Sequence, residues 1–91
     1  MIMRVRYSKR FNKRLVKAPL EVRKAFLIRR KLFLKNRDHP KLREHKLSGK
    51  YKGCSSINVT GDWRAVFLEE KIDGEVVVNF VALGTHSQLY G

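Results

Sequence analysis

The chain has 91 residues, 43% of them hydrophobic, which is enough for one modest core. This length excludes two domains around a deep cleft, so we expect a single domain over residues 1–91. Its 21 Lys and Arg against 8 Asp and Glu give a net charge of +13 at pH 7, which indicates a partner such as nucleic acid, an anionic membrane or an acidic protein. A single cysteine excludes an internal disulfide. No apolar run reaches the roughly 20 residues of a membrane span, and none at the start resembles the apolar core of a signal peptide. We therefore expect a cytoplasmic protein without a membrane segment.

The first predicted elements are a short strand and a short basic helix. Apolar and basic residues alternate over residues 2–7, which is typical of a strand with one buried face. The side chains expected on that face are Met3, Val5 and Tyr7. Ser8 then offers an N-cap for a helix over about residues 9–16.

A second helix is predicted to begin at Pro19 and to run to about Asn36. Its core-facing stripe consists of Val22, Ala25, Phe26, Leu32 and Phe33. Leu27 and Leu34, seven residues apart, fall on another side among basic residues. Two interpretations stay open for this pair: the following loop covers them, or they form a docking stripe for a partner helix.

The second half of the chain has the pattern of β-structure, after a polar connection over residues 36–50. Strands are predicted over residues 51–59, 63–69 and 75–83, with turns at 60–61 and 73–74. The last strand is almost continuously apolar, which is typical of a central strand covered on both faces. The order β-α-α-β-β-β predicts an α+β fold in which two helices pack on one face of a mainly antiparallel sheet.

Metal and thiol chemistry are poorly supported by the polar residues. The three histidines and the cysteine lack ligand spacings such as CxxC or HxxxH, so we expect no metal. Cys54 lies in a predicted half-buried strand, where cysteine usually behaves as an inert small hydrophobe. His39 precedes a proline in a polar loop and is interpreted as a loop residue.

Acid–base cleavage of RNA fits the remaining polar residues better. RNA supplies its own nucleophile, the 2′-OH, so cleavage needs a base, an acid and positive charge at the phosphate. His45 and His86 are the side-chain types that exchange protons near neutral pH, and Arg64 can bind two phosphate oxygens at once. Structural roles stay open for two neighbours: Asp62 as a turn residue and Trp63 as a core residue.

Three sequence blocks together resemble a known family. "HKLSGKYKG" (45–53), "GDWRAVF" (61–67) and "LGTHSQLYG" (83–91) occur in this order. They are similar to the RelE/ParE superfamily of bacterial and archaeal toxins, above all to its YafQ branch, which has the pattern H-x-L-x-G-x-W/Y-K-G, then D-W, then G-T-H-x-x-L-F/Y-G. The likeness covers about residues 36–91, while the N-terminal half agrees only in its strand-helix-helix order and basic character.

The resemblance implies a RelE-like fold with a twisted, mainly antiparallel sheet, and the toxin of a type II toxin–antitoxin system. It also implies a ribosome-dependent endoribonuclease that cuts mRNA in the ribosomal A site without a metal or other cofactor. The implied partners are mRNA, the ribosome with its 16S rRNA, and a cognate antitoxin. We expect the antitoxin to contact Leu27 and Leu34 and to form an oligomeric complex with the toxin.

The site residues that the resemblance implies come from the same three blocks. By position, the catalytic set consists of His45, Asp62, Arg64, His86 and Tyr90. The supporting residues are Trp63 and Asn58, and those expected to bind RNA are Lys46, Lys50 and Lys52. Asn58 departs from the pattern, because the YafQ branch usually has a histidine at this position and an amide cannot exchange a proton at neutral pH.

Two other functions stay open at the level of sequence. A toxin of the ParE kind shares the fold and inhibits DNA gyrase by binding, and it has no use for His45, Asp62 and His86 as a set. A plain RNA-binding or ribosome-associated protein would explain the charge, with the pairing of His86 and Tyr90 incidental.

Overall fold

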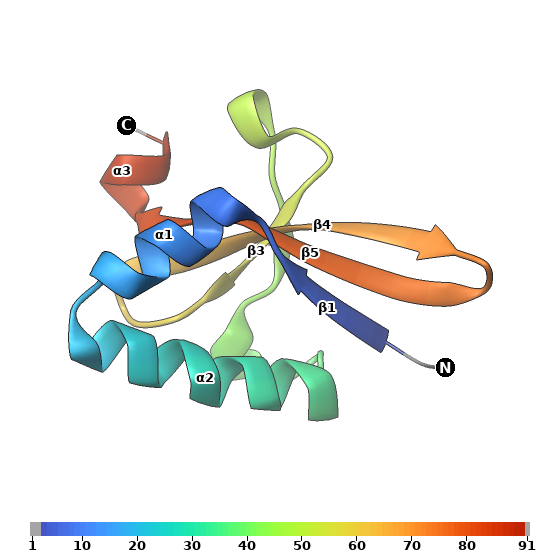
Figure 1. The fold of residues 1–91 in the computed structure, drawn as a ribbon, viewed down its shortest axis with the longest axis horizontal. Coiled ribbons are helices and arrows are strands. Elements are labelled where there is room, and N and C mark those ends of the chain that lie inside the picture. The colour runs from blue at the N-terminus through green and yellow to red at the C-terminus, as the bar shows by residue number, and fades with distance from the viewer. Residues whose placement is uncertain (1–2, 91) are drawn as a thin grey trace.

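Five strands form one mixed sheet in the computed structural model, which describes residues 3–90 (Figure 1). The strands are β1 (Met3–Tyr7), β2 (His45–Lys46), β3 (Ser55–Asn58), β4 (Trp63–Ile72) and β5 (Glu75–Thr85). They lie in the order β1-β5-β4-β3-β2, with β1 parallel to β5 and the other neighbours antiparallel. The α+β fold predicted from the sequence is therefore confirmed. Residue 2, the start of the first predicted strand, lies outside the described residues.

Helices cover this sheet from two sides. α1 (Lys9–Lys17) begins after Ser8, whose hydroxyl accepts a hydrogen bond from the Phe11 N–H at 3.0 Å, as predicted for an N-cap. α2 (Leu20–Lys35) follows Pro19, and both helices pack on one face of the sheet. α3 (His86–Tyr90), which the sequence did not predict, lies on the other side (Figure 1). Among residues 3–90, no helix is long and apolar enough to cross a membrane.

The chain around β3 differs most from the prediction. The polar connection contains a short 3₁₀ turn, η1 (Pro40–Leu42), and then β2. The strand predicted to begin at residue 51 begins at Ser55 instead, because the turn η2 (Gly49–Tyr51) and Gly53, with φ of 92°, redirect the chain before it. By contrast, the predicted hairpin turn between β4 and β5 is confirmed: Asp73 and Gly74 have φ of 50° and 79°, the left-handed conformation that a type I′ turn requires.

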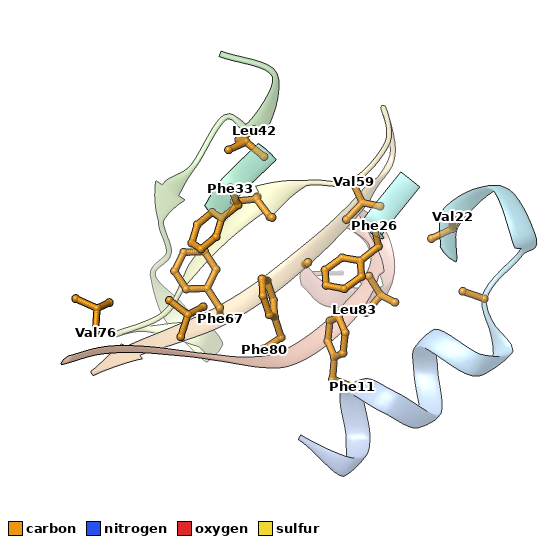
Figure 2. Close-up of a cluster of buried hydrophobic side chains, with 14 residues drawn as sticks. Phe11, Val22, Phe26, Phe33, Leu42, Val59, Phe67, Val76, Phe80 and Leu83 are labelled. Atoms are coloured by element: carbon orange, nitrogen blue, oxygen red, sulfur yellow. The ribbon is translucent and has the colours of Figure 1, made fainter. Parts of the chain in front are cut away.

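The main core lies between the sheet and the pair α1 and α2, and aromatic rings dominate it (Figure 2). Its five buried phenylalanines are Phe11, Phe26, Phe33, Phe67 and Phe80. The ring centroids of Phe11 and Phe26 lie 5.1 Å apart, and those of Phe67 and Phe80 lie 5.7 Å apart. Each such side chain contributes roughly 1.5–3 kcal/mol by leaving water, so the ring cluster fixes where both helices sit on the sheet.

A β-bulge in β5 allows that strand to serve two cores. Val66 pairs with Ala82 and Phe67 pairs with Phe80, so Val81 is an extra residue in β5. Beyond the bulge the alternation changes phase: Phe80 and Leu83 belong to the main core, whereas Ala82 joins Val66 and Leu89 in a smaller cluster on the other face. The central position predicted for this strand, with cover on both faces, is confirmed.

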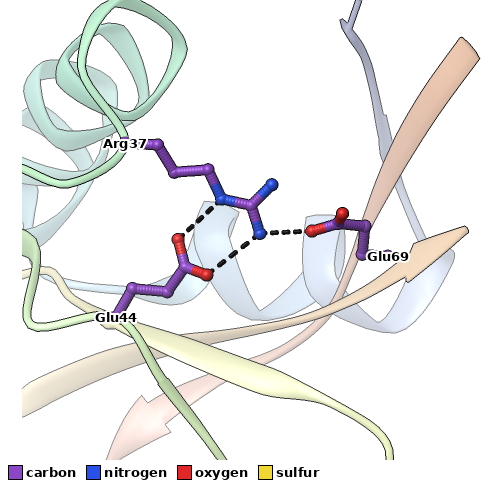
Figure 3. A network of polar contacts seen from close by, with 3 residues as sticks. All are labelled: Arg37, Glu44 and Glu69. Atoms are coloured by element: carbon purple, nitrogen blue, oxygen red, sulfur yellow. Dashed lines mark hydrogen bonds and ion pairs between the residues drawn. The ribbon is translucent and has the colours of Figure 1, made fainter.

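An arginine ties the segment after α2 to the sheet (Figure 3). The Arg37 guanidinium donates hydrogen bonds to both carboxylate oxygens of Glu44, at 2.7 and 2.9 Å, and also contacts the carboxylate of Glu69 on β4. It lies 4.9 Å from the ring centroid of Phe33. The hydrogen bond to Glu44 is the largest of the effects that raise the pKa of Arg37, which therefore stays charged. Because Glu44 precedes β2 directly, this network fixes where β2 begins.

Replacing Arg37 with methionine is expected to lower the free energy of unfolding by about 1–2 kcal/mol, because the ion pairs are partly exposed and the contact with the Phe33 ring is lost as well. Urea denaturation measures this change. The matched control is Arg23→Met, which removes the same charge from an exposed position of α2. Equal stability of the two variants would contradict the anchoring role of Arg37.

Replacing Ser56 with alanine is expected to raise the free energy of unfolding by about 1 kcal/mol. Ser56 lies fully buried in β3, and its hydroxyl has no hydrogen-bond partner among the described residues, so the side chain loses its bonds to water without replacement. Thermal and urea denaturation of Ser56→Ala and of its neighbour Ser55→Ala provide the comparison. A loss of stability specific to Ser56→Ala would show that the hydroxyl is satisfied.

Candidate active site

A hollow of about 600 Å³ opens on the side of the sheet that carries α3. Its lining residues are Arg43, His45, Lys46, Leu47, Ser48, Asn58, Arg64, His86 and Tyr90. We refer to it as the His45–His86 hollow. In the described part of the chain this lining is basic and contains no acidic side chain. Most of the residues that the sequence analysis assigned to a site therefore line one concave surface.

Strand register brings these residues together from distant parts of the sequence. Asn58 of β3 lies directly opposite Arg64 of β4, and Arg64 lies opposite Gly84 of β5. His45 of β2 pairs with Ser56, two residues before Asn58 on the same face of β3. His86 follows β5 immediately, so strand pairing brings the segments that carry the two imidazoles to the same part of the sheet.

The His45 ring is held by a local backbone contact. Its Nδ1 lies 3.0 Å from the carbonyl oxygen of Arg43, a residue with φ of 45°. A carbonyl oxygen can only accept, so Nδ1 carries the hydrogen and donates it. In the neutral ring this leaves a lone pair on Nε2, which is the form that a general base needs.

The Arg64 guanidinium is fixed by the turn that precedes β4. One terminal nitrogen donates to the carbonyl oxygens of Thr60, Gly61 and Trp63 at 3.0–3.2 Å, and the other donates to Gly61 at 3.2 Å. No acidic side chain among residues 3–90 forms an ion pair with Arg64. Since a guanidinium has five N–H donors, Nε and part of the second terminal nitrogen remain available to an anion in the hollow.

His86 and Tyr90 occupy the first and last positions of α3. The His86 N–H donates to the carbonyl oxygen of Asp62 at 3.1 Å, which joins α3 to the turn before β4. The rings of His86 and Tyr90 lie 4.8 Å apart and tilted by 63°, and Tyr90 also meets Tyr51 edge to face at 6.1 Å. Residues 86–90 thus form a helical turn that contributes an imidazole to the hollow.

Four residues expected in the site do not line the hollow. Asp62 is exposed in the turn before β4, and its carboxylate forms no hydrogen bond or ion pair within residues 3–90. Trp63 packs against the main core, because alternation along β4 turns it away from the face that carries Arg64. Lys50 and Lys52 lie in and just after η2, outside the lining. The hollow therefore lacks the carboxylate of Asp62, and the site roles expected for these four residues stay predictions.

Other lining residues were missed by the sequence analysis. Arg43, Leu47 and Ser48 reach the hollow only because β2 pairs with β3, and a strand of two residues gives no readable alternation. Cys54 stays outside the lining, and burial raises the pKa of its thiol, which favours the unreactive protonated form. Within residues 3–90, no three His, Cys, Asp or Glu side chains are grouped to hold a metal ion.

The hollow combines two imidazoles, two arginines and Lys46 on one surface. Imidazoles can give and take protons, and the cations can stabilise a negatively charged phosphorus centre. The arrangement is therefore suited to chemistry on a phosphodiester.

The chain is similar to known proteins in sequence pattern and in fold. A family profile described as "Bacterial toxin of type II toxin-antitoxin system, YafQ" matches residues 3–91. YafQ from Escherichia coli BL21(DE3) superimposes with a TM-score of 0.75 at 21% identity over 96% of this chain and 97% of that one. YafQ in the E. coli DinJ–YafQ complex gives 0.71 at 23% identity, over 96% and 97% of the chains.

An archaeal structure has the same fold. The match in the RelE–RelB complex from Pyrococcus horikoshii OT3 gives a TM-score of 0.72 at 23% identity, over 97% of this chain and 99% of that one. A comparison with curated protein sequences gave no significant match. The profile match spans almost the whole chain, and the chain belongs to the YafQ family of bacterial toxins of type II toxin–antitoxin systems.

Proposed function

We propose that this toxin is a ribosome-dependent endoribonuclease that cuts mRNA in the ribosomal A site. The observation that supports this best is that His45, Arg64 and His86, from three separate segments, line one hollow in which residues 3–90 place no acidic side chain. The hollow is open to solvent, which suits a single-stranded substrate whose nucleotides can be turned outward.

Each group in the hollow has a part in the proposed reaction. His45 Nε2 takes the proton from the 2′-OH, the 2′-oxygen attacks phosphorus, and the bond to the 5′-oxygen breaks. His86 gives a proton to that leaving 5′-oxygen, so the products are a 2′,3′-cyclic phosphate and a free 5′-OH. Arg64 and Lys46 stabilise the negative charge that builds up on the phosphate oxygens.

The neighbouring residues support this reaction in different ways. Tyr90 holds the His86 ring and offers a face for stacking a base, and the Asn58 amide can donate to a phosphate oxygen beside Arg64. Asp62 contributes through its backbone carbonyl, and the catalytic carboxylate implied by the resemblance stays a prediction. We expect Lys50 and Lys52, which lie outside the hollow, to contact ribosomal RNA phosphates, so binding should be salt-sensitive.

Two other functions remain to be separated from this one by experiment. A gyrase inhibitor of the ParE kind has the same fold, so the fold does not distinguish it. A ribosome-associated protein without catalysis would also bind RNA through its charge. The gathering of His45 and His86 in one hollow favours the nuclease, because neither alternative has a use for two imidazoles in the same hollow.

Replacing either His45 or His86 with alanine is expected to reduce mRNA cleavage on ribosomes by at least about 100-fold, because each removes one proton-transfer step. Mapping of mRNA 5′ ends and a reconstituted ribosome assay measure this loss. The wild-type rate should pass through a maximum as pH changes, because one imidazole must be neutral while the other is charged.

His39→Asn is the control for this experiment, since it changes a histidine outside the hollow, and asparagine can still cap η1 as His39 does. Growth arrest by wild-type protein with gyrase–DNA damage and without mRNA cleavage would identify the ParE-like alternative. Arrest with neither lesion would leave RNA binding without catalysis as the explanation.

The outer face of α2 is the surface proposed for the antitoxin. Leu27 and Leu34 are each 48% exposed, so the interpretation that the following loop covers them is wrong. Leu20, 54% exposed, extends the pair at the same spacing of seven residues. The DinJ–YafQ and RelE–RelB complexes support an antitoxin partner for this chain as well. A partner helix would fit this basic face if it had an apolar stripe to contact the leucines and acidic residues on either side of that stripe.

The double variant Leu27→Ser, Leu34→Ser is expected to weaken antitoxin binding by at least tenfold while cleavage stays unchanged, because α2 lies across the sheet from the hollow. Isothermal titration with the cognate antitoxin measures binding. Ile72→Ser is the matched control, since Ile72 is an exposed apolar residue on another element. Unchanged affinity in the double variant would exclude this face as the contact.

A further inference from the structure

The short helix α3 has only five residues, too few to be stable alone, so its contacts decide where His86 stands. A reciprocal pair of hydrogen bonds closes its first turn. The Gln88 N–H donates to Thr85 Oγ1 at 3.2 Å, and the Thr85 N–H donates to Gln88 Oε1 at 2.9 Å. This is a capping box, and His86 is the residue directly after its first member.

The amide oxygen of Gln88 is also the acceptor for a cation on α1. Arg14 donates to Gln88 Oε1 at 2.5 Å, and its guanidinium carbon lies 5.0 Å from the centre of the Trp63 ring. Trp63 begins β4 and pairs with Thr85. Arg14 therefore joins the start of β4, which leads to Arg64, to the cap of α3, which carries His86.

The surroundings leave few alternatives for the Gln88 side chain. A Cβ atom on Gly84 would lie 3.1 Å from Gln88 Oε1 and 3.3 Å from Gln88 Cβ, so the side chain rests on the bare backbone of β5. Arg14 lines a groove of about 520 Å³ together with Lys9, Arg10, Lys13 and Lys17, and no acidic side chain lines it in the described chain. The Gln88 amide is thus the acceptor that holds the Arg14 guanidinium at α3.

We propose that Arg14 and Gln88 are positioning residues, which hold α3 so that His86 lines the hollow together with Arg64. The proposal rests on the proposed nuclease function for its catalytic consequence. Neither residue lines the hollow, and both act through the placement of His86. The alternative is that Leu89, which is buried in the smaller core, anchors α3 by itself and that the polar contacts are incidental.

The test compares Gln88→Ala and Arg14→Met with wild type in single-turnover cleavage at saturating ribosome concentration. Each is expected to cleave at least about tenfold more slowly, since small displacements of a catalytic group have large effects on rate. Gln88→Glu should stay within about threefold of wild type, because a carboxylate accepts from both Arg14 and the Thr85 N–H. Lys13→Met removes a charge from the same groove and controls for weaker RNA binding. It should raise the ribosome concentration needed for half-maximal cleavage and leave the rate at saturation unchanged.

A second measurement does not depend on catalysis. Amide hydrogen exchange of Leu89 and Tyr90, and the imidazole NMR signals of His86, should change in Gln88→Ala and Arg14→Met and not in Lys13→Met. Unchanged exchange and signals would overturn the proposal, as would altered signals with a wild-type saturated rate. If the wild-type protein cleaves no mRNA, the nuclease function fails, while the exchange and NMR data still decide whether these two residues hold α3.

Discussion

The pairing of β5 with β1 on one side and β4 on the other is the constraint on which the rest of the molecule depends. It covers both edges of β5, while its two faces contribute to the aromatic core and, through the bulge at Val81, to the smaller cluster that includes Leu89. The Ser8 N–H donates to the Phe80 carbonyl oxygen at 3.0 Å and the Ser8 hydroxyl to that of Val81 at 3.4 Å, so the start of α1 is tied to this bulge. The same strand therefore packs against the main core and against Leu89 of α3.

Two arginines outside the hollow connect this framework to the two histidines. Arg37 fixes the segment that leads into His45, through Glu44 and Glu69, and Arg14 contacts the cap of the helix that presents His86. Both also lie over aromatic rings of the main core, Phe33 and Trp63. A chain with a net charge of +13 thus uses two of its arginines in structural contacts. Arg43, Lys46 and Arg64 line the hollow and form no ion pair with a carboxylate of residues 3–90.

Local patterns in the sequence predicted the elements that depend on them. Alternation around Val5, the Ser8 cap, the stripe containing Phe26 and Phe33, and the Asp73-Gly74 turn were all confirmed. The structure departs from these predictions where contacts between distant parts of the chain determine the local structure. The two-residue strand at His45 exists only as a partner of β3, and α3 depends on contacts with Arg14 and the Asp62 carbonyl. The sequence named most of the hollow's residues but could not place Asp62 or Trp63. Asp62 lies in the turn before β4, and the face on which Trp63 lies is set by how β4 pairs in the sheet.

The β4–β5 hairpin extends away from α3 as a narrow arm (Figure 1). Its tip at Asp73 and Gly74 is exposed, and along β4 it lies nine residues beyond Arg64, which corresponds to roughly 30 Å of extended strand. A fluorophore or affinity handle attached at this tip would therefore stand clear of both the hollow and the outer face of α2. The arm offers a point for labelling the protein while it is bound to its partners, so that its arrival and departure can be followed in real time.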